Sequence, residues 1–133
     1  MSARTERILV VDDQTYFRTM VIEQLRRLGF QEILQADSGM DALSQMANAR
    51  PDLILLDINM KPMDGLEFLA RVRANATLKN RDVPVIFLTS HAESDKVRRA
   101  IELGAAGYLV KPIAFLDLQA RIASALGRKA KGG

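Results

Sequence analysis

The sequence predicts an α/β fold: a doubly wound (βα)5 arrangement, in which a five-stranded parallel sheet carries helices on both faces. Five short apolar runs have the length and the β-branched content of buried strands. Amphipathic stretches, with apolar residues three and four positions apart, lie between these runs. Continuous apolar runs are typical of strands that are covered on both faces, so the alternation favours a parallel sheet with right-handed crossovers.

The predicted strands are the apolar runs themselves. In order along the chain they are Ile8–Val11, Ile33–Leu34, Leu53–Leu56, Val83–Leu88 and Tyr108–Val110.

The first two predicted helices are bounded by residues that commonly start or end helices. The first ends at Gly29, and its apolar face carries Phe17, Met20, Val21, Leu25 and Leu28. The second opens at Ser38 and Gly39 and closes before Pro51, and its apolar residues are Ala42, Leu43, Met46 and Ala47.

The remaining three helices are predicted from the same signals. Asp64 is the expected N-cap of the third, whose apolar face carries Leu66, Leu69 and Val72. Ser94 or Asp95 caps the fourth, Gly104 follows its end, and its inward residues are Val97, Ala100 and Ile101. The last helix runs from about Phe115 to Leu126.

Length and composition predict one domain. The 133 residues, 48% of them hydrophobic, suffice for one core, so we expect an N-terminal segment at 1–6, the domain at 7–127 and a basic flexible tail at 128–133. The absence of cysteine excludes disulfides and thiolate metal sites and suits the cytoplasm, where we expect the protein. No apolar run approaches the roughly 18 residues of a membrane helix, so we expect no membrane insertion. The net charge is +3, but no nucleic-acid-binding signature is present and no direct DNA binding is expected.

Polar residues follow four of the five predicted strands. Asp12 and Asp13 follow the first, Asp57 the third, Thr89 and Ser90 the fourth, and Lys111 the fifth. In a parallel sheet these ends share one edge, where open α/β sheets bind their ligands. Each residue alone has a plain explanation as a turn former, a helix cap or a surface lysine. Their joint occurrence at four strand ends predicts a site.

Three carboxylates at one edge repel one another, and a divalent cation relieves that repulsion. Oxygen ligands without histidine or cysteine favour Mg²⁺, which keeps waters and open coordination positions. Such a site suits phosphoryl transfer, with one carboxylate as the nucleophile and an aspartyl phosphate as the product. Lys111 would then neutralise a phosphoryl oxygen, and the Thr89 hydroxyl would donate to another.

The chain resembles the receiver domain of bacterial two-component response regulators, and is most similar to the stand-alone, CheY-like members with their flavodoxin-like fold. The segments that carry the resemblance are RILVVDD at 7–13, DLILLDINM at 52–60, VPVIFLTS at 83–90 and GAAGYLVKP at 104–112. Together they span nearly the whole chain, in the order and spacing of the family.

The resemblance implies a role for each site residue. Asp57 would be the phosphoacceptor, and Asp12 and Asp13 the acidic pair that holds Mg²⁺ together with the backbone carbonyl of Asn59. Thr89 would move toward the phosphoryl group and Lys111 would form an ion pair with it.

The resemblance also implies a switch and its partners. Tyr108 would rotate between exposed and buried positions, and the bond between Lys111 and Pro112 would be cis. A sensor histidine kinase would donate the phosphoryl group. A downstream protein would bind the face formed by the fourth helix, fifth strand and fifth helix, including Lys96, Arg99, Tyr108 and part of Phe115–Leu126.

The loop after Asp57 departs from the family pattern. It contains Lys61-Pro62 where the family has proline one position earlier, which puts loop geometry and kinase recognition in question. Ser90 stands where a smaller residue is common, which bears on phosphoryl access. His91, two residues after Thr89, would either influence water access to the phosphoryl group or lie in the loop without a role.

Other functions are weighed against this one. A phosphatase of the haloacid dehalogenase type needs a second aspartate where this chain has Asn59. An FMN-binding flavodoxin needs a small, hydroxyl-rich loop after the first strand, whereas here that loop begins with two aspartates. A phosphorelay intermediate, or a docking adaptor that uses Arg71, Arg73, Arg98 and Arg99, is compatible with the receiver interpretation. Chemotaxis is the process most often linked to stand-alone receivers, and it enters only as an analogy.

Overall fold

Five parallel strands form one sheet between two layers of helices in the computed structural model, which describes residues 4–90 and 95–132. The strands are β1 (Arg4–Val11), β2 (Phe30–Ala36), β3 (Leu53–Asp57), β4 (Val85–Thr89) and β5 (Gly107–Val110). The helices are α1 (Thr15–Arg27), α2 (Gly39–Ala49), α3 (Gly65–Ala74), α4 (Asp95–Glu102) and α5 (Phe115–Gly132). The strand order is β2-β1-β3-β4-β5. Every pairing is parallel, which the sequence predicts.

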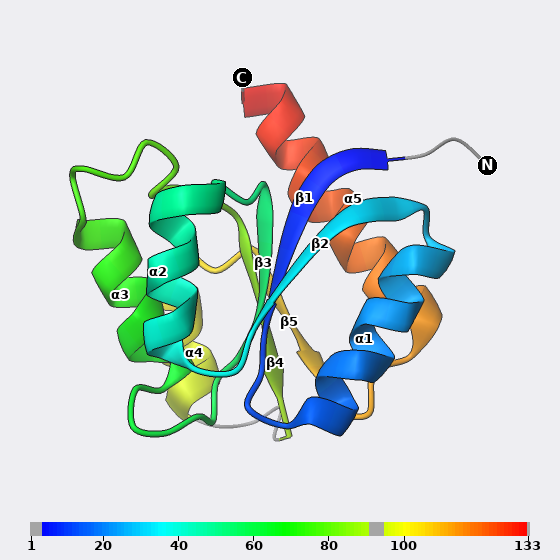
Figure 1. The fold of residues 1–133 in the computed structure, drawn as a ribbon, viewed down its shortest axis with the longest axis horizontal. Coiled ribbons are helices and arrows are strands. Elements are labelled where there is room, and N and C mark those ends of the chain that lie inside the picture. Colours follow the sequence, from blue (N-terminus) through cyan, green and yellow to red (C-terminus); the bar gives the residue numbers. More distant parts are fainter. Residues whose placement is uncertain (1–3, 91–94, 133) are drawn as a thin grey trace.

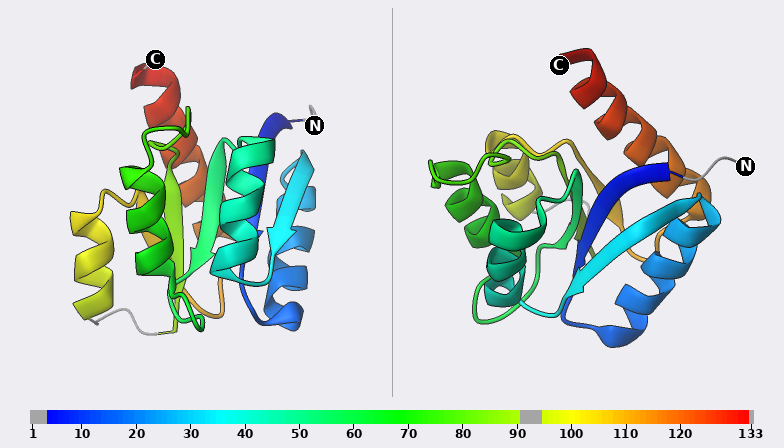
Figure 2. Two further views of the ribbon diagram at one scale, coloured as in Figure 1. Left: turned by 60° about the vertical axis from the view of Figure 1, so that its left-hand side comes forward. Right: turned by 45° about the horizontal axis from the view of Figure 1, so that its top comes forward.

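The helices cover both faces of the sheet, as expected for a doubly wound fold. Figure 1 shows α2, α3 and α4 on one face and α1 and α5 on the other, and the two further views in Figure 2 agree. Each face has its own apolar core, one centred on Phe68 and Phe87 and the other on Leu25 and Ile122. No described helix combines the length and the hydropathy that a membrane span requires.

Local chemistry explains where several helices begin and end. The Ser38 and Asp64 side chains accept hydrogen bonds from the backbone N–H groups of Asp41 and Glu67, so both act as the predicted N-caps. Gly29 and Gly104 follow α1 and α4 with φ values of 99° and 83°, the left-handed conformation that glycine adopts without strain. Of the two caps proposed for α4, Ser94 lies outside the described residues, and Asp95 is the first helical residue.

Two residues predicted to face inward are exposed. Ile101 is 60% exposed because the eight-residue helix α4 buries only Val97 and Ala100. Met20 is 37% exposed because it lines a hollow with Phe17 and Pro112.

The ends of several elements also differ from the prediction, and β2, predicted as Ile33–Leu34, extends over Phe30–Ala36. Strand β1 begins at Arg4, inside the predicted N-terminal segment 1–6, because Arg4 pairs with Phe30 of β2. Strand β4 begins at Val85, since Pro84 lacks the N–H that a ladder needs. The segment 128–132, predicted as a flexible tail, continues α5, because arginine, lysine and alanine favour helix.

The fold brings the β3–α3 loop back against the end of β3. The N–H of Gly65 donates to the carbonyl of Ile58 at 2.9 Å. A Cβ at position 65 would lie 2.5 Å from the backbone oxygen of Asp57 and 3.1 Å from Cα of Ile58. Glycine is therefore required at this position for the chain to pass so close to Asp57.

We expect Gly65→Ala to lower the free energy of unfolding by about 1–3 kcal/mol, because backbone atoms would have to move. Gly127→Ala is the matched control, since its Cβ meets nothing within 4 Å and alanine favours helix. Urea denaturation of both variants measures the difference. A Gly65→Ala protein as stable as Gly127→Ala would contradict the tight approach.

Candidate functional site

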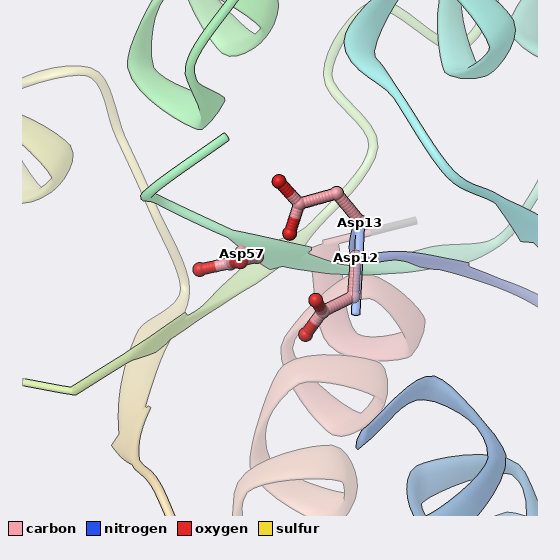
Figure 3. A group of neighbouring side chains, drawn as sticks. All are labelled: Asp12, Asp13 and Asp57. Carbon is pink, nitrogen blue, oxygen red and sulfur yellow. The ribbon is translucent and has the colours of Figure 1, made fainter. Parts of the chain in front are cut away.

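Three carboxylates meet at the edge of the sheet where β1 and β3 end. Val11 and Leu56 are paired in the two strands, so the residues that follow them, Asp12 and Asp57, emerge side by side. Both are buried, at 0% and 3% exposure, whereas Asp13 is exposed. Each residue offers a carboxylate oxygen, and the three atoms lie within 4.8 Å of one another. Figure 3 shows the three side chains gathered at this edge.

Burial and like charge make ionisation of Asp57 unfavourable. Removal from water raises the pKa of Asp57, and the neighbouring Asp12 charge raises it further. The hydrogen bond from the Asn59 N–H and the charge of Lys111 lower it, but the raising effects prevail and the pKa is about 6. The described side chains therefore leave negative charge at this edge incompletely balanced.

The donor set fits a hard divalent cation. Mg²⁺ prefers carboxylate, carbonyl and water oxygens, and it commonly uses only one or two carboxylates from the protein. Asp13 is exposed, which places the group beside solvent that could complete the coordination. The incompletely balanced charge at Asp57 is a physical reason for a cation to bind there.

The Asp57 carboxylate is fixed from two directions. Its Oδ1 accepts a 3.0 Å hydrogen bond from the backbone N–H of Asn59. Its Oδ2 lies 3.5 Å from the Lys111 ammonium, an ion pair longer than a normal hydrogen bond. One oxygen is thus held by the loop, and the other faces a cation.

Lys111 lies closer to Asp12 than to Asp57. Its Nζ donates to Asp12 Oδ2 at 3.0 Å and to the Gln14 side-chain carbonyl at 3.2 Å, and it lies 4.2 Å from the centre of the Phe17 ring. Sequence reasoning missed Gln14, and it placed Phe17 on the apolar face of the first helix without a contact to Lys111. Their proximity to the Asp12-Asp13 pair in the sequence was the only available signal. The bond between Lys111 and Pro112 is cis, as the resemblance implies, and the Lys61–Pro62 bond is cis as well.

Thr89 and Tyr108 lie on the same face of the sheet. Thr89 ends β4, is 2% exposed, and follows Leu88, the partner of Asp57. Tyr108 is paired with Phe87, two residues before Thr89, and packs partly buried against the core on the α4 side. Because side chains alternate along a strand, Phe87, Thr89 and Tyr108 all face α4.

Two residues predicted for the output face make contacts elsewhere in the protein. Lys96 reaches away from that face, and its ammonium donates to the Asn59 side-chain carbonyl at 3.0 Å, beside the acidic group. Phe115 faces α1, where its ring stacks under Arg27 at 4.2 Å. The exposed side of β5 and α5 forms a hollow of about 400 Å³ whose lining includes Tyr108, Val110 and Arg121.

The structure bears differently on three other residues named from the sequence. Arg73 is used internally: it donates to the carbonyls of Arg81 and Val83 at 2.7 and 2.8 Å, so it is not available for the adaptor role. Ser90 is exposed, and His91 lies outside the described residues.

Comparison with known proteins agrees with the site and the fold. Residues 8–123 match the model of the response regulator receiver domain. The chain is 34% identical to chemotaxis protein CheY-3 of Vibrio cholerae over 87% of this chain and 88% of that protein. It is 36% identical to chemotaxis protein CheY of Pseudomonas aeruginosa, over 87% and 92% of the two chains.

Solved structures show the same likeness. The chemotaxis protein CheY4 of Vibrio cholerae superposes with a TM-score of 0.83 and 33% identity, over 92% of this chain and all of that chain. The signal receiver domain of a diguanylate cyclase from Desulfovibrio desulfuricans gives 0.84 and 30%, over 98% and 100%. The chain therefore belongs to the response regulator receiver family, the CheY-like signalling domains of two-component systems.

Proposed function

We propose that this receiver accepts a phosphoryl group on Asp57 from a sensor histidine kinase and thereby switches its binding to a downstream protein. The observation that carries the proposal is the buried Asp57 carboxylate, which lies beside Asp12, Asp13 and the Lys111 ammonium. A buried carboxylate with a raised pKa at the end of a strand is a strong candidate for a functional group.

Asp57 acts as the nucleophile. One of its oxygens attacks the phosphorus of the phosphohistidine, an O–P bond forms, and the electron pair of the broken P–N bond returns to the imidazole. Asp57 must be ionised to attack, and a pKa of about 6 leaves it mostly ionised above pH 7. The backbone N–H of Asn59 fixes the carboxylate, so that little reorientation is needed during transfer.

Asp12, Asp13 and Asp57, with the Asn59 carbonyl, would hold Mg²⁺. When bound, the ion supplies positive charge to the oxygens of the transferring group. Lys111 provides the second positive charge: its Nζ lies 3.5 Å from Asp57 Oδ2 and moves toward the phosphoryl oxygens of the product. Thr89, at the adjacent strand end, supplies a hydroxyl donor.

Thr89 and Tyr108 pass the state of Asp57 to the output face. Phosphorylation adds charge and acceptor oxygens at Asp57, which draw the Thr89 hydroxyl inward. The space that Thr89 leaves lies on the face where Tyr108 packs, so the ring moves in beside α4. Coupling of this kind is typically about 1–3 kcal/mol, a shift between two existing populations. The downstream partner binds the α4-β5-α5 face. We place the phosphoryl transfer and this binding in the cytoplasm.

Asp57→Asn removes the proposed acceptor, so we expect no labelling by acetyl phosphate with Mg²⁺, measured as hydroxylamine-sensitive phosphate by mass spectrometry. Asp64→Asn is the control, because asparagine still caps α3, and it should label like the wild type. Hydroxylamine-sensitive phosphate on Asp57→Asn would disprove the assignment.

Asp57 should also make stability depend on pH when divalent cations are absent. Its pKa is raised from 3.8 in the unfolded chain to about 6 in the fold, so its carboxylic acid form is favoured by folding. Asp57 does not lower the stability of the fold below pH 4. Its destabilising effect develops as pH rises from 4 to about 6.5. Asp57→Asn should therefore be more stable than the wild type by roughly 2–3 kcal/mol at pH 7.5 and about equal at pH 3.5.

Urea denaturation in EDTA at several pH values measures this difference. Saturating Mg²⁺ should reduce it, because the cation stabilises the ionised form. A difference that does not change with pH would show that Asp57 is not destabilised by burial.

Tyr108 should report the switch by fluorescence, since the chain has two tyrosines and no tryptophan. In Tyr16→Phe, which changes a side chain that is 78% exposed, Tyr108 is the sole tyrosine. Beryllium fluoride, a phosphoryl mimic, with Mg²⁺ should reduce acrylamide quenching of Tyr108. Adding Thr89→Val, which keeps the shape but removes the hydroxyl, should abolish the change. Equal protection with and without the hydroxyl would contradict the coupling.

A further inference from the structure

Two side chains that the phosphoryl transfer does not require surround the Lys111 ammonium. The side-chain carbonyl of Gln14 accepts a hydrogen bond from Lys111 Nζ at 3.2 Å, and the centre of the Phe17 ring lies 4.2 Å from the same Nζ. The carboxylate nearest to Nζ is that of Asp12, at 3.0 Å, whereas Asp57 is at 3.5 Å. The cation therefore rests nearer to the metal-site aspartate than to the proposed phosphoacceptor.

These contacts matter because Lys111 has little access to water. Its side chain is 12% exposed, so the protein must supply most of what water would otherwise give the ammonium. A carboxylate, a carbonyl and an aromatic face are each favourable partners for a cation. An ammonium has three N–H donors, and two of them are used by Asp12 and Gln14.

One short segment anchors both partners. The backbone N–H of Gln14 donates to Asp12 Oδ1 at 2.8 Å, which ties the residue to the carboxylate that Lys111 contacts. Gln14 is the N-cap residue of α1, but its side chain forms no cap hydrogen bond and is free to serve Lys111. Phe17 lies in the first turn of α1 and lines a hollow of about 500 Å³ together with Gln14 and Lys111.

We propose that Gln14 and Phe17 are positioning residues that hold Lys111 toward Asp12 and so limit its movement to phosphorylated Asp57. This inference rests on the proposed function of Asp57. Phosphoryl oxygens lie beyond the carboxylate, so Lys111 has to give up or lengthen its hydrogen bond to Gln14 to reach them. Weaker holding therefore favours the phosphorylated state.

To test this proposal, beryllium fluoride is titrated into protein saturated with Mg²⁺, and its binding is measured by NMR. Gln14→Leu keeps the bulk of the side chain but removes the acceptor, and we expect it to bind the mimic about two- to tenfold more tightly. Gln119→Leu, on the exposed side of α5, is the matched control and should bind like the wild type.

Two substitutions of Phe17 separate the effect of its aromatic ring from the effect of its bulk. Phe17→Leu removes the aromatic face, and we expect about two- to fivefold tighter binding of beryllium fluoride. Phe17→Tyr keeps the face and should restore wild-type affinity. The Lys111 Cε protons should show an upfield ring-current shift in the wild type and in Phe17→Tyr, lost in Phe17→Leu. If Phe17 only fills space, leucine can replace it, and the affinity of Phe17→Leu for beryllium fluoride would not change.

The outcomes separate this inference from the proposed function. If beryllium fluoride fails to bind the wild type, or binds Asp57→Asn equally well, the proposed function fails. If it binds the wild type through Asp57 but Gln14→Leu and Phe17→Leu bind it equally or more weakly, the holding role is wrong and the proposed function stands.

Discussion

The repulsion between carboxylates at the end of β1 and β3 is the constraint on which the rest of the site depends. Asp12 and Asp57 are both buried, and the strand register brings them out side by side. Desolvation and mutual repulsion raise the pKa of Asp57 to about 6, so its ionised form is less favourable in the fold than in water. Lys111 supplies one positive charge, and a hard divalent ion would supply more.

The β3–α3 loop and α4 both place polar groups beside the acidic residues. The β3–α3 loop folds back tightly enough that only glycine fits at position 65, and it places the Asn59 N–H on Asp57. Lys96 reaches from α4 to the Asn59 side chain, which brings another cation close to the acidic group. The β3–α3 loop is thus in contact with α4 directly, in addition to the proposed route through Thr89 and Tyr108. A change at Asp57 that moves this loop would reach α4 through both.

Much of this could be predicted from the sequence because the determinants are local. Apolar runs of strand length, caps such as Ser38 and Asp64, and polar residues at strand ends are readable without coordinates. Parallel pairing then brings Asp12 and Asp57 together and places Thr89 and Lys111 on neighbouring strand ends, in agreement with the fold. The roles of these residues, including Asn59, remain proposals.

What the sequence did not predict depends on side-chain direction and on how far each helix covers the sheet. Ile101 has the spacing of a buried residue, but α4 is too short to bury more than Val97 and Ala100. Lys96 was assigned to the output face, and only its extended conformation shows that it contacts Asn59. Gln14 and Phe17 carry no signal of their own, because their role follows from the position of the Lys111 ammonium.

The most direct test of the central claim is an NMR titration of the Asp57 carboxyl carbon in protein labelled with ¹³C-aspartate. Assignment uses Asp57→Asn, which lacks that signal. Without divalent cations the titration midpoint should lie near 6, and added Mg²⁺ should move it downward. A midpoint near 3.8 that Mg²⁺ leaves unchanged would contradict both the unfavourable burial and the cation site.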